Sequence, residues 1–188
     1  MRIVGLALVT LALGLVACSP PKPAEAPAPA APPAANPAPV NPPPPGSPGG
    51  LPDDRTPISE GKIDPKSAQG AAQVTQTYYA AIGEGKYGEA WALWGDGGKA
   101  SGLSQADFAK GFDRYASYNA QVGAPGDPEG AAGSSYVTVP VVIYGRLKTG
   151  AEVHETGEMQ LRRVNDVDGA TAEQRRWHIA RIDTKPTP

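Results

Sequence analysis

The sequence has little cysteine and histidine, with one Cys and two His among its 188 residues. One cysteine cannot form a disulfide within the chain, so the folded part must be stabilised by its core alone. The two histidines, His154 and His178, can share a metal only if they lie in register on neighbouring strands. We expect each to be a solvated strand residue instead. The sequence therefore predicts no metal site and no cofactor.

Strong charge of one sign and long hydrophobic runs are also missing. The formal net charge is −2, which gives no basic footprint for nucleic acid. The one long apolar run, residues 3–16, has about 14 residues, fewer than the ~20 that a membrane-spanning helix needs. Its length, and Arg2 before it, are typical of a signal peptide.

This run ends at Leu15-Val16-Ala17-Cys18, which holds the only cysteine. The four residues resemble the lipobox of bacterial lipoproteins. The resemblance implies that residues 1–17 are a signal peptide and that Cys18 becomes the lipid-modified first residue, since several acyl chains anchor a protein firmly to a membrane. Ser19 follows instead of Asp, which in that family favours an outer-membrane protein facing the periplasm. An ordinary signal peptide or an uncleaved anchor is the alternative.

Residues 18–64 are expected to form a disordered tether rich in proline and alanine. Between Pro20 and Gly50 the only charges are Lys22 and Glu25, and such a composition cannot bury a core. Polyproline II is the expected conformation. We interpret the segment as a spacer between membrane and domain; a PxxP-type ligand for a partner's groove is the alternative.

The globular domain is expected at residues 65–184, followed by a frayed tail at 185–188. Apolar spacing predicts a helix that begins at Asp64-Pro65 and ends near Gly83, and a short one from Tyr87 to Gly95. A third helix should begin at the N-cap Ser104 and extend its apolar face to Tyr115. Alternation predicts strands at residues 118–122, 136–147, 153–164 and 177–183. The order of elements indicates an α+β fold, with three helices on one face of a curved antiparallel sheet.

The long strand should have two apolar faces. Val137, Val139, Val141 and Ile143 lie on one face, and Tyr136, Thr138, Val142 and Tyr144 lie on the other. We expect both faces to be partly covered, and the second face could support a homodimer. Pro140 inside this strand predicts a bulge or a missing hydrogen bond.

Several segments resemble the nuclear transport factor two-like superfamily, which includes ketosteroid isomerases, polyketide cyclases of the SnoaL type and dehydratases. They are residues 78–82 and 85–90, similar to its paired opening helices, and residues 161–164 and 177–179, similar to its closing strands. The resemblance covers residues 66–184 and implies a cone of helices and bent sheet around a cavity. No residue matches the catalytic Asp and Tyr of the isomerases or the His of the dehydratases.

The candidate pocket residues are Tyr78, Tyr79, Trp91, Trp94 and Glu155. Glu155 falls on the core-facing side of its strand, where a carboxylate would be partly desolvated. A strand that begins at Gly157 would instead leave Glu155 in water, and aromatics at helical spacing are more often core. No G-x-S-x-G motif occurs, and residues 95–99 lack the spacing of a phosphate-binding loop.

Two functions are compatible with these features. The shortage of acid–base residues favours a membrane-tethered lipoprotein whose non-catalytic domain binds a protein partner or a small hydrophobic ligand. The alternative is a small enzyme of isomerase or cyclase type, with Glu155 as base in an apolar cavity and a tyrosine as donor.

Overall fold

The computed structural model describes residues 37–54 and 61–187 of the chain. The predicted signal peptide and Cys18 lie outside the described residues, as do residues 19–36 and 55–60 of the expected tether. The compact unit that contains the domain begins at Ala38. Its elements are α1 (Ala68–Gly83), α2 (Tyr87–Ala92), the 3-10 helix η1 (Lys99–Ser101), α3 (Gln105–Gly111), β1 (Tyr115–Val122), β2 (Glu129–Ala131), β3 (Ser134–Leu147), β4 (Glu152–Val164) and β5 (His178–Pro186).

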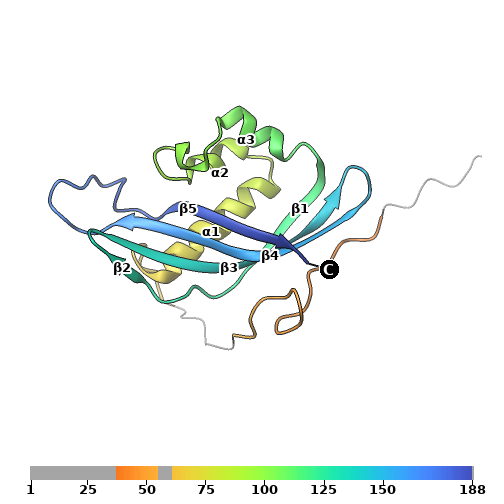
Figure 1. Cartoon of the computed structure of the whole chain (residues 1–188), viewed down its shortest axis with the longest axis horizontal. Coiled ribbons are helices and arrows are strands. Elements are labelled where there is room, and N and C mark those ends of the chain that lie inside the picture. Colours follow the sequence, from red (N-terminus) through yellow and green to blue (C-terminus); the bar gives the residue numbers. More distant parts are fainter. Residues whose placement is uncertain (1–36, 55–60, 188) are drawn as a thin grey trace, which may run out of the picture. The chain divides into compact units, whose positions relative to one another are not determined.

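The strands form one antiparallel sheet in the order β1-β3-β4-β5, and the short β2 pairs with the start of β3. The helices lie together on one face of this curved sheet (Figure 1). The predicted α+β class, with three helices on a curved antiparallel sheet, is therefore confirmed. Register shifts between Tyr115 and Ser117 in β1, and between Gln160 and Leu161 in β4, mark irregular points of the sheet.

Helix starts follow local capping chemistry. The Ser104 side chain accepts a hydrogen bond from the Asp107 amide at 3.1 Å and donates one to the Asp107 carboxylate at 2.7 Å, as the predicted cap requires. The first helix begins later than expected, because Ser67 is its N-cap. Asp64 instead forms a turn in which its carboxylate accepts from the Lys66 amide. The third helix ends at Gly111, and Tyr115 belongs to β1.

The core lies between the helices and the face of β3 that carries Val137, Val139, Val141 and Ile143. Its fully buried strand residues are Val137, Val139, Val141, Ile143, Met159, Leu161 and Ile179, and the helices contribute Ala71, Tyr78, Tyr79, Ile82, Ala90 and Phe108. Val142 points to the opposite face, yet it is only 1% exposed and is not part of this cluster. Both faces of β3 are thus covered at least in part, as predicted.

Pro140 is accommodated without loss of a bond between β3 and β4. Its carbonyl accepts from the Gly123 amide at 2.9 Å, just beyond the last pair of β1 and β3, Val122 with Val141. The nitrogen and carbonyl of a strand residue point to the same neighbour. The missing donor therefore falls where β1 ends, which is the kind of position where a strand tolerates proline.

The compact unit extends further than the expected domain at both ends. Residues 38–54 belong to it, although composition placed them in the tether. At the other end, β5 continues to Pro186 and Thr187 donates its amide to the His154 carbonyl at 2.9 Å.

Within residues 37–54 and 61–187, no helix combines the length and apolar character required for crossing a membrane.

Candidate functional site

Three of the candidate pocket residues, Tyr78, Tyr79 and Trp94, belong to one aromatic cluster. Tyr78 and Tyr79 are 4% and 5% exposed, and their rings meet edge to face at 4.9 Å. Tyr78 also contacts Trp94 and Phe108, at ring distances of 6.5 and 6.3 Å. These separations are those of packed aromatic pairs. The rings therefore form a packed part of the core.

Glu155 lies within β4, which begins at Glu152, so the alternative of a strand starting at Gly157 does not apply. Its side chain is half-buried and accepts a hydrogen bond from the Thr184 hydroxyl at 2.8 Å. Burial raises the pKa of Tyr79 well above its usual range, and the neighbouring Tyr78 and Glu155 add to the effect. Burial likewise raises the pKa of Tyr118, which also lies near Glu155. Both phenols therefore stay protonated at neutral pH.

The Tyr79 hydroxyl has no hydrogen-bond partner among the described residues, although it is buried. Trp91 packs against the same core, and its indole N–H donates to the Leu103 carbonyl at 3.1 Å. The structure thus brings Tyr78, Tyr79, Trp94 and Glu155 into one region, and Trp91 is partly buried against the same core. None of the three pockets that we describe in this chain is lined by any of Tyr78, Tyr79, Trp94 and Glu155.

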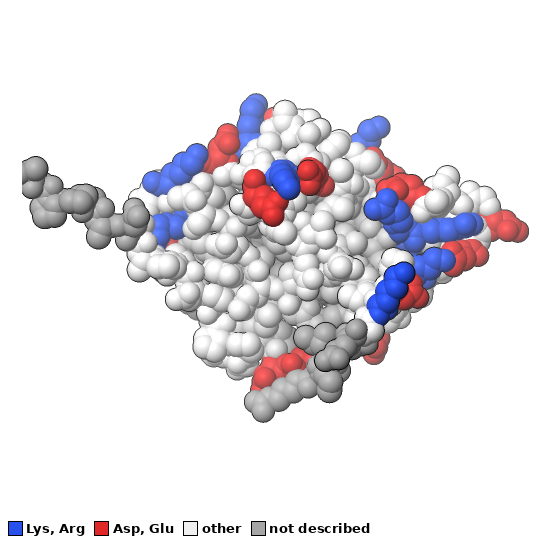
Figure 2. Space-filling model, turned by 180° about the vertical axis from the view of Figure 1, so that it is seen from behind, with Lys and Arg blue, Asp and Glu red and all other residues white. Residues whose placement is uncertain are grey.

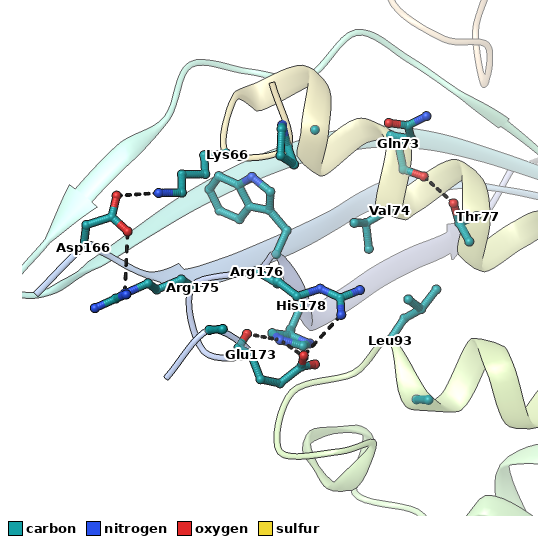
Figure 3. A pocket seen from close by; sticks show the side chains of 15 residues that line it. Lys66, Gln73, Val74, Thr77, Leu93, Asp166, Glu173, Arg175, Arg176 and His178 are labelled. Carbon is teal, nitrogen blue, oxygen red and sulfur yellow. Dashed lines mark hydrogen bonds and ion pairs between the residues drawn. The ribbon is translucent and has the colours of Figure 1, made fainter. Parts of the chain in front are cut away.

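The largest of these pockets lies elsewhere, at the end of the domain where the β4–β5 loop meets the helices (Figure 3). It has a volume of about 420 Å³ and is lined by Pro65 and Lys66, by one side of α1, by the end of α2, and by Asp166 and most of residues 172–178. A second pocket of about 370 Å³ shares Glu173 and His178 with it. A cavity of this size is within the range that small ligands occupy.

Apolar side chains form part of the pocket wall. Val74 of α1 and Leu93 after α2 contribute aliphatic surface, and Trp177 contributes its indole. Trp177 is 3% exposed, and its ring N–H donates to the Ser67 carbonyl at 3.0 Å. The guanidinium of Arg163 lies 5.4 Å from the centre of the Trp177 ring. Trp177 therefore joins the start of α1 to the sheet and fixes the wall of the pocket.

Charged side chains line the rest of the pocket. The Lys66 Nζ atom lies 2.7 Å from the Asp166 Oδ2 atom, and the Arg175 Nε atom lies 3.6 Å from Oδ1 of the same carboxyl group. Arg176 contacts the Glu173 carboxylate at 3.2 Å, and the His178 Nε2 atom lies 2.9 Å from the Glu173 carbonyl oxygen. Three Lys and Arg side chains thus face two carboxylates. Figure 2, the view from behind, shows charged side chains crowded at this end of the domain, whereas the centre of the face in view is mostly uncharged.

The hydrogen bond from Lys66 holds the pKa of the Asp166 carboxyl below its usual range, and Arg175 and Arg163 add to the effect. A lowered carboxyl pKa keeps the Lys66–Asp166 contact present at neutral pH and removes it only as the pH falls through that lowered value. Both side chains are about half exposed, so the contact arranges the pocket entrance more than it stabilises the fold.

Sequence reasoning did not identify these residues, because Lys66 and Asp166 are a hundred positions apart. The available signal was the density of charge at residues 166–176, between the predicted strands at 153–164 and 177–183. The two histidines are also separated: His178 pairs with Arg162 at one end of β4, and His154 pairs with Tyr144 near the other. Within the described part of the chain, no three His, Cys, Asp or Glu residues gather in a metal-binding group.

Comparisons with known proteins give few matches. No family model matches the sequence, and no curated protein matches it. Two solved structures from Novosphingobium aromaticivorans are similar to the chain. One, provisionally described as an aromatic ring hydroxylase, is 11% identical with a TM-score of 0.49, over 67% of this chain and 96% of that one. The other, provisionally described as a scytalone dehydratase, is 13% identical with a TM-score of 0.42, over 62% and 80%. Similarity this low assigns no activity to the chain.

Proposed function

We propose that the chain is a lipid-anchored protein of the bacterial envelope, held through Cys18 on the periplasmic side of the outer membrane. In this proposal the domain has the nuclear transport factor two-like fold and is a non-catalytic binding module. Its ligand is a protein partner or a small hydrophobic molecule. The observation that carries the proposal is the contrast between an interior occupied by packed aromatic rings and an open pocket at the β4–β5 end.

The pocket suits such a ligand for two reasons. Val74 and Leu93 offer apolar surface, and burial of such surface supplies most of the free energy of binding. The Lys66 side chain is 48% exposed and the Arg176 side chain is 70% exposed, so both can exchange their present carboxylate partners for an anionic group of the ligand. Electrostatic complementarity of this kind gives specificity more than affinity.

The pocket assignment can be tested by photo-crosslinking of the full chain in cells. A photoreactive residue at Gln73, which lines the pocket, should give a specific adduct whose mass identifies a protein or a small ligand. The matched control is Gln76, an exposed glutamine on the same helix that does not line the pocket. We expect at least fivefold more adduct at Gln73, and its loss in the Lys66→Glu/Arg176→Glu double variant. Equal labelling at both positions would contradict the assignment.

The anchor has its own test. Cys18→Ala should abolish incorporation of labelled fatty acid and remove the protein from the membrane fraction, because one residue carries all the acyl chains. Ser19→Ala is the matched control and should keep both label and membrane retention. Acyl label on the Cys18→Ala protein, or membrane retention without label, would contradict the proposed anchor.

The alternative function is an enzyme of isomerase or cyclase type. The Glu155 carboxylate beside the unpartnered Tyr79 hydroxyl favours it, since a carboxylate base and a phenol donor are the groups that such chemistry uses. The aromatic rings that pack around Tyr78 and Tyr79 argue against it, because a substrate needs space next to the base.

A further inference from the structure

Residues 38–54, which we call the strap, have a defined local conformation despite their proline-rich composition. The Ser47 amide donates to the Pro44 carbonyl at 3.1 Å and its hydroxyl donates to the same oxygen at 2.6 Å. The Gly50 amide donates to the Ser47 carbonyl, and the Gly46 amide donates to the Leu51 carbonyl at 2.8 Å. Gly46 and Gly49 supply the two left-handed positions of this loop. The strap is therefore folded between Pro44 and Leu51.

The strap also contacts three separate parts of the domain. Arg146 of β3 donates to the Ala38 carbonyl at 3.1 Å. Thr187, after β5, lies so close to Gly49 that a side-chain carbon there would be 3.3 Å from the Thr187 Cβ atom. A carbon placed on Gly123 would lie 3.2 Å from Leu51, so the strap also reaches the end of β1. Contacts with β1, β3 and the end of β5 place the strap against the sheet.

Burial on the outer face of the sheet agrees with these contacts. Val142 is 1% exposed and faces away from the helices, so another apolar group must cover it. Leu51 is half-buried and lies near Pro140, two residues from Val142 on the same face. Val40, Pro42 and Pro43 of the strap are half-buried as well.

We propose that the outer sheet face is the docking surface for the chain's own strap, so that the free part of the tether ends at Ala38. Taken with the proposed anchor, docking leaves 19 residues (19–37) between Cys18 and the docked strap, instead of the 46 residues (19–64) of the expected tether. At about 3.5 Å per extended residue, the greatest distance that the tether can span between Cys18 and the domain falls from about 160 Å to about 70 Å. The strap also occupies the face that we had considered for a homodimer.

The geometry of Gly49 and Thr187 allows a direct test by disulfide formation. In the full chain carrying Cys18→Ser, the pair Gly49→Cys/Thr187→Cys would place two Cβ atoms near the separation that a disulfide requires. The matched control is Gly46→Cys/Thr187→Cys, because Gly46 has the same left-handed backbone but contacts Asp53 instead of Thr187. Mild oxidation should link the first pair within one chain at least tenfold faster than the second. Equal rates, or links between two copies, would overturn the proposal.

A second variant separates docking from any disturbance caused by the new cysteines. Leu51→Asp in the Gly49→Cys/Thr187→Cys chain should slow the linkage about tenfold, because a carboxylate cannot cover the apolar face. Leu103→Asp, at an exposed leucine on the helix side of the domain, should not change it. Hydrogen exchange of the unaltered full chain gives a readout without any substitution. Protection of the Gly46 and Gly50 amides is expected, and complete exchange at the first time point would overturn docking.

Discussion

Trp177→Ala is expected to lower the free energy of unfolding by about 3–5 kcal/mol, the usual cost of deleting a buried tryptophan. Trp177 is 3% exposed, belongs to the main core and holds the Ser67 carbonyl at the N-cap of α1. Its loss removes buried apolar area and leaves that carbonyl without its indole donor. Urea denaturation followed by circular dichroism measures the change.

Trp177→Phe is the matched control for this experiment. Phenylalanine keeps a buried ring but cannot donate to Ser67, so a smaller loss of about 1–2 kcal/mol is expected. Because Trp177 also forms part of the pocket wall, Trp177→Ala should also weaken the photo-crosslink at Gln73 under conditions where the variant stays folded. A loss below about 1 kcal/mol for Trp177→Ala would show that this residue does not join α1 to the sheet.

Gly157→Ala is expected to cost about 3 kcal/mol, at the upper end of the usual range for overpacking. Gly157 pairs with Val141 on one side and Thr184 on the other. A side-chain carbon at this position would collide with the Asp183 carbonyl and crowd the Thr184 backbone. Since these are backbone atoms of β5, relief requires β4 and β5 to move apart over the Glu155 region.

Gly130→Ala is a suitable comparison, because Gly130 is also a strand glycine and nothing lies within 4 Å of its added carbon. We expect a change within about 0.5 kcal/mol there. Thermal and urea unfolding of both variants would measure the difference. Equal stability of the two variants would mean that β5 does not approach β4 as closely as the structure indicates.

The elements that sequence reasoning located best are those with local signals. The Ser104 cap is encoded within four residues, and the alternation of Val137 to Ile143 specifies which face of β3 enters the core. The alternation in β4 likewise placed Glu155 on the core-facing side, where it lies near Tyr79. Such predictions need only the spacing of apolar residues within a single segment.

Features that depend on distant segments could not be predicted in this way. Composition classified residues 38–54 as tether, because proline and glycine indicate weak core formation but do not reveal a complementary surface on β1, β3 and β5. The start of the first helix was placed at Asp64, since Asp and Ser are both good N-cap residues. The hydrogen bond from Trp177 to Ser67 favours Ser67, and it joins residues that are 110 positions apart. The pocket depends on Lys66 meeting Asp166, which no local pattern encodes.

The stability of Tyr79→Phe tests most directly whether the interior around Tyr79 is packed core, as we propose, or a ligand cavity. The Tyr79 hydroxyl is buried without a partner among the described residues, and an unsatisfied buried donor destabilises the folded state by about 1–3 kcal/mol. If the interior is filled, the full-length Tyr79→Phe protein should be more stable than the parent by about 1 kcal/mol in urea denaturation. A loss of about 1 kcal/mol or more would mean that the hydroxyl binds a water or ligand in an internal cavity, so that the interior is not filled by side chains.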